Sequence, residues 1–119
     1  MHCPPVGATD TALADTWRLI PNPNPSPLDF SSKAELGLPC DENADPCAWA
    51  SCSLFTKVKH LLRLKRLRAE YPYLVKLNIP AGVGLHVAGG KRAHLDFWRY
   101  AGTDLTNYVV SVEDANNDH

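Results

Sequence analysis

Three segments in the second half of the chain alternate apolar and polar residues. Residues 73–79 place Tyr, Val, Leu and Ile on one side of the backbone, and residues 94–100 and 107–113 repeat the alternation. Because successive side chains of a β-strand point to opposite faces, this pattern predicts strands with one buried face. A shorter strand is expected at 85–87. Strands that follow a helical segment in succession predict an α+β fold with a mixed, mainly antiparallel sheet.

The first part of the chain predicts one strand and a proline-rich connection. Residues 16–20 alternate, with Arg18 on the face opposite Trp17. The sequence "PNPNPSP" at 21–27 has proline at every second position, which keeps the backbone extended and removes hydrogen-bond donors. The Ser-Lys-Ala-Glu sequence at 32–35 has the form of a capping box, so we expect a short helix there.

A kinked helical segment is predicted between the two groups of strands. From 54 to 62 the apolar side chains share one helical face, with Ser53 as the expected N-cap. From 64 to 71 they follow a stripe on a different side. The change of face predicts a kink near 63–64 and a second helix that ends before Pro72. We expect the sheet to pack against this segment.

Length and composition point to one globular domain. The chain has 119 residues, of which 45% are hydrophobic and 21% charged. We expect a flexible N-terminal arm at 1–14, a single α+β domain at 15–113 and a disordered tail at 114–119. The net charge of −1 does not favour nucleic acid as a partner. The basic stretch 57–68 spreads its charges around several sides of a helix, which favours a solvated surface.

The sequence also predicts the compartment and the state of the cysteines. Its apolar runs are far shorter than the ~20 residues needed to span a bilayer, and the first residues lack the pattern of a signal peptide. We therefore expect no membrane contact and a cytoplasmic location. Cys3, Cys40, Cys47 and Cys52 include no Cys-x-x-Cys pair, so no metal site is expected. In a reducing compartment they are expected to be free, mostly buried thiols.

Two groups of polar residues are candidates for a binding site. His94, Asp96 and Trp98 lie at alternate positions of one predicted strand, so they share a face. A polar pair beside an aromatic ring suits a flat ligand, although the solvent-facing side of a half-buried strand has the same pattern. Ser51 and Ser53 flank a cysteine and offer either ligand hydroxyls or a cap and a small strand residue. A Ser-His-Asp catalytic arrangement lacks the G-x-S-x-G elbow that would support it.

The order of four stretches resembles a known superfamily. "TWRLI" (16–20) places Arg on an early strand, and "ASCSLF" (50–55) places Ser-x-Ser before a predicted helix. "YLVKLNIPAGVGLHV" (73–87) is a strand-turn-strand, and "HLDFWRY" (94–100) is a strand with an acidic residue. This layout is similar to the Arg, Ser-x-Ser, Glu layout of the ADP-ribosyltransferase superfamily, which includes bacterial mono-ADP-ribosylating toxins.

The resemblance implies a cleft between two small sheets that holds NAD. Arg18 would face the phosphates or ribose of the dinucleotide. Ser51 would orient the nicotinamide ribose and support the acid, and Asp96 would occupy the position of the family's Glu. The carboxylate would bond the ribose 2′-OH and stabilise the oxocarbenium-like state as nicotinamide leaves. Arg18, Ser51 and Asp96 are thus the catalytic candidates, and Ser53, His94 and Trp98 join Arg18 and Ser51 as NAD contacts.

Two departures from the family pattern leave a second class of function open. Asp96 is one methylene shorter than Glu, and His94 lies where a second acidic residue is frequent; Glu113 is another acid, late in the chain. The first expectation is an NAD-dependent enzyme, ADP-ribosyltransferase-like, that transfers ADP-ribose to an unknown acceptor. The alternative is a small non-catalytic bacterial or phage-type module that binds a protein partner through an aromatic edge made of Phe97, Trp98 and Tyr100.

Overall fold

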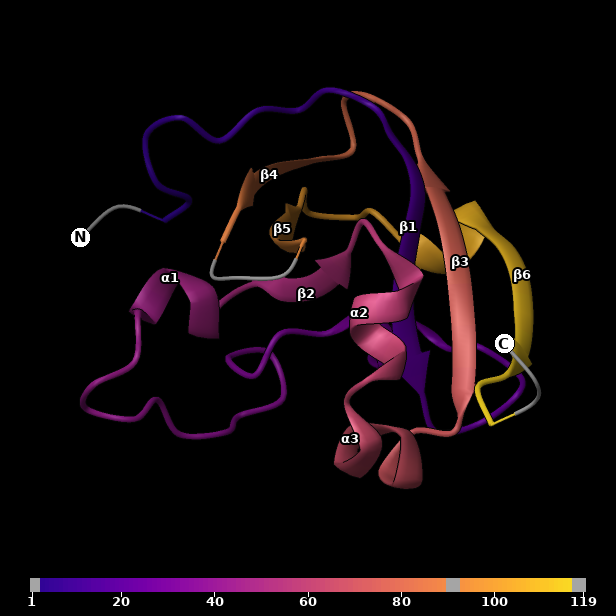
Figure 1. Ribbon diagram of the computed structural model, residues 1–119. Coiled ribbons are helices and arrows are strands. Elements are labelled where there is room, and N and C mark those ends of the chain that lie inside the picture. The colour runs from indigo at the N-terminus through magenta and orange to yellow at the C-terminus, as the bar shows by residue number, and fades with distance from the viewer. Residues whose placement is uncertain (1–2, 90–92, 117–119) are drawn as a thin grey trace.

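Six strands form one sheet in which each pair of neighbours is antiparallel. The computed structural model describes residues 3–89 and 93–116 (Figure 1). The strand order is β4-β5-β2-β1-β3-β6. The strands are β1 (Leu13–Ile20), β2 (Cys52–Phe55), β3 (Tyr73–Ile79), β4 (Gly84–Ala88), β5 (His94–Arg99) and β6 (Val109–Asp114). The predicted α+β class is confirmed, as are the strands in the second half of the chain.

Short helices cover both faces of this sheet. In Figure 1, α2 (Val58–Leu62) lies in front of β1, α3 (Lys65–Glu70) lies below α2, and α1 (Pro46–Trp49) lies at the left end of β2. The 3-10 helices η1 (Pro27–Phe30) and η2 (Leu105–Tyr108) complete the described helical elements. The predicted kink is confirmed, because α2 ends at Leu62 and Leu64 is the N-cap of α3. No helix within residues 3–89 and 93–116 is long and apolar enough to cross a bilayer.

The predicted start of the helix at residue 54 is wrong. Ser53 does not cap a helix but lies in β2, opposite Asp96 of β5. The N-cap of α2 is Lys57 instead. The position of Leu54 fits both the apolar face of a helix and the alternation of a strand. Pairing with β5 selects the strand, which buries Cys52 and Leu54 on the same face.

Two other local predictions differ from the structure. The capping box forms between Ser32 and Glu35. The backbone N–H of Ser32 donates to the carboxylate of Glu35, and the backbone N–H of Glu35 donates to the hydroxyl of Ser32, each at 3.0 Å. The residues that follow make only turns, so no helix grows from it. The polar stretch 38–47, with prolines near both ends, also predicts a loop. Instead α1 begins there, and Asp45 caps it by accepting from the backbone N–H of Cys47 at 2.9 Å. The "Asp-Pro" sequence at this point is a typical helix start.

The expectation of four free thiols is wrong for two of them. A disulfide joins Cys3 to Cys47, while Cys40 and Cys52 are free. The pair is 44 residues apart in sequence, so spacing alone gave no indication of it. The expected flexible arm is therefore attached to α1, and its Thr9 also exchanges two backbone hydrogen bonds with His86 of β4. At the other end, Ala115 of the expected tail is fully buried.

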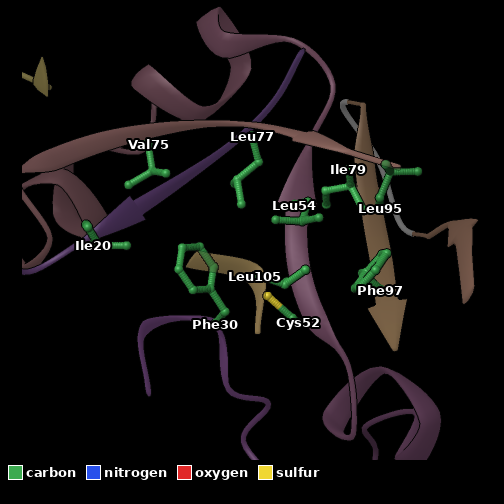
Figure 2. Close-up of a cluster of buried hydrophobic side chains, with 10 residues drawn as sticks. All are labelled: Ile20, Phe30, Cys52, Leu54, Val75, Leu77, Ile79, Leu95, Phe97 and Leu105. Carbon is green, nitrogen blue, oxygen red and sulfur yellow. The ribbon is translucent and has the colours of Figure 1, made fainter. Parts of the chain in front are cut away.

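Buried side chains form one cluster on each face of the sheet. The first cluster is gathered under η1 and η2, which contribute Phe30 and Leu105 (Figure 2). The second cluster lies under α2 and α3 and includes Leu19, Leu61 and Leu74. The members of the first cluster are Ile20, Phe30, Cys52, Leu54, Val75, Leu77, Ile79, Leu95, Phe97 and Leu105. Both faces of β1 and β3 are therefore covered, which keeps them at the centre of the fold.

The sheet is weakly joined between β1 and β2. These two strands have a single pair in register, Trp17 with Phe55, whereas β1 and β3 have six. Beyond that pair the strands diverge, and the side chain of Arg18 crosses the gap to the carbonyl of Ser53. The sheet therefore consists of two three-stranded halves, β4-β5-β2 and β1-β3-β6, and the opening between them positions the candidate site.

Candidate functional site

A cavity of about 600 Å³ lies over the opening between β1 and β2. One side is formed by β1, β2 and β5, another by the segment from η1 to α1, and a third by the leucines of α2 and α3. The leucines Leu64 and Leu67, which the sequence placed on the second helical stripe, contribute to this third wall. These two leucines therefore line the cavity and also pack against the second cluster.

Five of the six sequence-predicted site residues line this cavity. They are Arg18, Ser51, Ser53, His94 and Asp96, supplied by β1, the start of β2, and β5. Trp98 does not line it. Its indole N–H donates to the carbonyl of Cys47 at 3.0 Å and fastens α1 instead. The alternation in β5 correctly put Trp98 on the same face, but α1, which the sequence did not reveal, covers that end of the strand.

Arg18 presents a fixed positive charge to the cavity. Its Nε donates to the carbonyl of Asp29 at 2.7 Å, and one terminal nitrogen donates to the carbonyl of Ser53 at 2.8 Å. These carbonyls orient the guanidinium without neutralising it. Among the described residues, no carboxylate forms an ion pair with Arg18. A guanidinium carries five N–H donors, so others remain for an anionic ligand.

Asp96 presents a buried negative charge to the same cavity. The residue is 8% exposed, and its Oδ1 lies 3.2 Å from the hydroxyl of Ser51. That hydroxyl also donates to the carbonyl of Ala48 at 2.7 Å, so one proton is shared between two acceptors. Gly89 permits the arrangement, because a Cβ there would lie 2.4 Å from Oδ2 of Asp96. Within the described part of the chain, Ser51 is the only side chain that donates to this carboxylate.

His94 is held beside Asp96 by contacts on its ring. Its Nδ1 lies 2.7 Å from the carbonyl of Gly89, and its ring meets Phe55 edge-on with centroids 5.3 Å apart. Nδ1 is 3.8 Å from Oδ1 of Asp96, which is an electrostatic approach without a hydrogen bond. The imidazole and the carboxylate are therefore neighbours at one end of the cavity.

Ser51 owes its position to the short helix α1. The helix begins at Pro46, is capped by Asp45, and is connected to the N-terminal segment by the Cys3–Cys47 disulfide. Its last residue, Trp49, donates its indole N–H to the carbonyl of Leu38 at 2.9 Å. The chain then enters β2, which leaves Ser51 at the junction with its side chain toward Asp96.

The aromatic edge proposed for the alternative function is wrong in one of its three residues. Phe97 is 1% exposed and belongs to the first cluster (Figure 2). Of the other two, Trp98 is partly buried against α1 and Tyr100 is 39% exposed. A partner could therefore reach only part of that surface.

No protein-family model, curated protein or solved structure matches the chain. Within residues 3–89 and 93–116, no three His, Cys, Asp or Glu side chains are grouped to hold a metal ion.

Proposed function

We propose that the cavity between β1 and β2 binds NAD and that the chain is an ADP-ribosyltransferase-like enzyme. One observation supports this most strongly. Among the described residues, a guanidinium without a carboxylate partner and a buried, poorly hydrogen-bonded carboxylate line the same cavity from opposite halves of the sheet. Opposite charges presented to one cavity suit a ligand that carries both signs, and NAD has a pyrophosphate and a pyridinium ring.

Arg18 is the residue that binds the pyrophosphate in this proposal. Its guanidinium is already oriented by the carbonyls of Asp29 and Ser53, so little side-chain freedom is lost when an anion arrives. Charge-assisted hydrogen bonds from Arg to phosphate are among the stronger ones in proteins. Lys at this position would keep the charge and lose the two fixed carbonyl contacts.

Asp96 and Ser51 act on the nicotinamide ribose. The Ser51 hydroxyl shares its proton between Asp96 and the carbonyl of Ala48. A ribose hydroxyl would give Asp96 a second donor, one that the carbonyl of Ala48 does not compete for. The carboxylate then faces the carbon at which positive charge develops as nicotinamide leaves, and a buried anion stabilises that charge more than one in water. The volume of about 600 Å³ is within the usual range of ligand pockets, and the leucine wall offers apolar surface to the bases.

Thermal unfolding with NAD tests the proposal. Wild-type protein should gain about 2.7 kcal/mol at an NAD concentration of 100 Kd, seen as a rise in Tm. Arg18→Ala should abolish the rise, whereas Arg66→Ala, which removes an exposed arginine of α3 away from the cavity, should preserve it. If millimolar NAD does not shift the Tm of the wild type, the NAD proposal fails and the protein-binding alternative gains support.

The disulfide bears on the compartment in which the enzyme works. The sequence predicted the cytoplasm, where thiol buffers reduce most disulfides. The Cys3–Cys47 bond favours an oxidising compartment instead, because structural disulfides form and persist there. A count of free thiols in protein isolated from its native cells separates the two locations.

A further inference from the structure

We infer that His94 is the general base of the reaction and that the acceptor is an oxygen nucleophile, either water or a hydroxyl group. The inference rests on the proposed binding of NAD in the same cavity. It starts from three observations at one end of that cavity: the hydrogen bond from His94 to Gly89, the approach of His94 to Asp96, and the exposure of the imidazole to the cavity.

The hydrogen bond fixes which ring nitrogen carries the proton. The carbonyl of Gly89 can only accept, so Nδ1 of His94 must be the donor at 2.7 Å. A neutral imidazole protonated on Nδ1 has its lone pair on Nε2. No side chain or backbone group in the described part of the chain hydrogen-bonds this Nε2. The ring therefore offers a basic nitrogen that the fold itself does not use.

The same contacts hold the ring in place. Phe55 meets it edge-on, and the backbone N–H of Gly89 donates to the carbonyl of His94 at 3.1 Å, so residues 89 and 94 bond each other twice. The side chain is 21% exposed, which leaves part of the ring accessible from the cavity. A base has to be within hydrogen-bond reach of the proton it removes, and this ring is next to the carboxylate that marks the reacting carbon.

The identity of the base indicates the class of acceptor. A guanidinium acceptor carries a positive charge that a further carboxylate would pair with, whereas the group adjacent to Asp96 is an imidazole. A neutral imidazole forms no ion pair with a cation, but it accepts a hydrogen bond from water or a hydroxyl group. The pair His94 and Asp96 therefore favours an uncharged oxygen nucleophile.

The step balances without any further reactant. The oxygen of the nucleophile forms a bond to C1′ of the nicotinamide ribose, and the bond from C1′ to the ring nitrogen breaks. The bonding pair leaves with the nicotinamide, which becomes neutral. The proton of the nucleophile passes to Nε2 of His94. The products are nicotinamide and ADP-ribose, either free or attached to the hydroxyl group.

The test combines one variant that keeps a donor to Gly89 with one matched control. In His94→Asn, the amide nitrogen can still donate to the carbonyl of Gly89, but no basic nitrogen remains. We expect this variant to keep the NAD-dependent rise in Tm and to release nicotinamide at least about 100-fold more slowly than the wild type. His86→Asn, a change in β4 at a residue that contacts Thr11 away from the cavity, should release nicotinamide at the wild-type rate.

Two further measurements use readouts that a purely structural role would not change. Added imidazole should restore nicotinamide release in His94→Ala, because a free base can occupy the space of the missing ring. Reaction of the wild type in water containing methanol should give ADP-ribose and its methyl glycoside. Addition of agmatine, which carries a guanidinium group, should give no adduct.

The outcomes separate this inference from the proposal on which it rests. If the wild type releases nicotinamide and His94→Asn does so equally fast, His94 is not the base and only this inference fails. An agmatine adduct would overturn the assignment of the acceptor. A wild type that neither binds NAD nor releases nicotinamide would overturn the proposed function, and this inference with it.

Discussion

The hydroxyl of Ser51 lies 3.2 Å from the carboxylate of Asp96, although the two residues are 45 positions apart in the sequence. Ser51 follows a four-residue helix, and Asp96 lies in the middle of β5. Their contact connects the chain just after α1 to β5, beside the cavity that both residues line. Because the hydroxyl proton is shared with the carbonyl of Ala48, the carboxylate is available to a ligand.

Replacing Asp96 by Asn should abolish nicotinamide release while the fold is retained. The amide keeps the size of the side chain and an oxygen that can accept from Ser51, but it removes the charge that we propose stabilises the oxocarbenium-like state. We expect a loss of about 100-fold to 1,000-fold, measured by the release of nicotinamide from NAD. Glu70→Gln at the exposed end of α3 is the matched control. Full activity in Asp96→Asn would show that the acid is assigned to the wrong residue.

The same Val→Ala change should have very different effects at two places in the sheet. Val75 of β3 is completely buried in the first cluster, whereas Val110 of β6 is 54% exposed. Val75→Ala should lower the free energy of unfolding by about 2 kcal/mol, since two methylene equivalents lose burial and leave a cavity. Val110→Ala should change it by less than about 0.5 kcal/mol. Urea denaturation measures both, and equal effects would contradict the assignment of the core.

Reduction should destabilise the protein through the Cys3–Cys47 disulfide. The bond closes a long loop and anchors α1, so its loss should cost about 2–5 kcal/mol. Dithiothreitol should therefore lower the Tm of the wild type, and Cys3→Ser should have a low Tm with or without the reductant. Cys40→Ser should behave like the wild type, because Cys40 is exposed and free. A Tm that does not respond to dithiothreitol would argue against the bond.

The two free thiols should differ in reactivity and in their effect on stability at high pH. Cys52 is buried, and this burial raises the pKa of its thiol above the ordinary value, whereas Cys40 is exposed. Iodoacetamide should therefore label Cys40 in the native protein and label Cys52 only after unfolding. Since the pKa of Cys52 is raised in the fold, the unfolded chain loses this proton first. The free energy of unfolding should thus fall as pH rises above about 9, the ordinary pKa of the thiol. Cys52→Ala should remove that part of the pH dependence, and equal labelling of both thiols in the native state would contradict the burial.

The sequence predicted the fold class and the later strands because their alternation has one interpretation. Segments such as Tyr73–Ile79 fit a strand and no helix. The segment around Leu54 fits both, and the choice depends on pairing with β5, which a local pattern does not contain. α1 was missed because four residues are too few to show periodicity. The disulfide joins two distant cysteines, and only the folded chain brings them together.

The candidate site was partly predictable for a related reason. Arg18, Ser51 and Asp96 were expected to share a cleft from the resemblance to the ADP-ribosyltransferase layout, and all three line one cavity. The placement of His94 followed from the alternation of β5, but its hydrogen bond to Gly89 depends on the geometry of the β4–β5 hairpin. Trp98 was assigned to the ligand because the helix that covers it, α1, was not predicted.

The single pair in register between Trp17 and Phe55 has a mechanical consequence. The two halves of the sheet, joined at one pair, can rotate relative to each other about that pair, because few backbone hydrogen bonds between β1 and β2 resist the movement. A ligand that contacts both β1 and β5 provides a second connection between the two halves, on the side where the strands are not paired. Occupancy of the cavity should therefore stiffen the whole sheet, including strands that the molecule never touches.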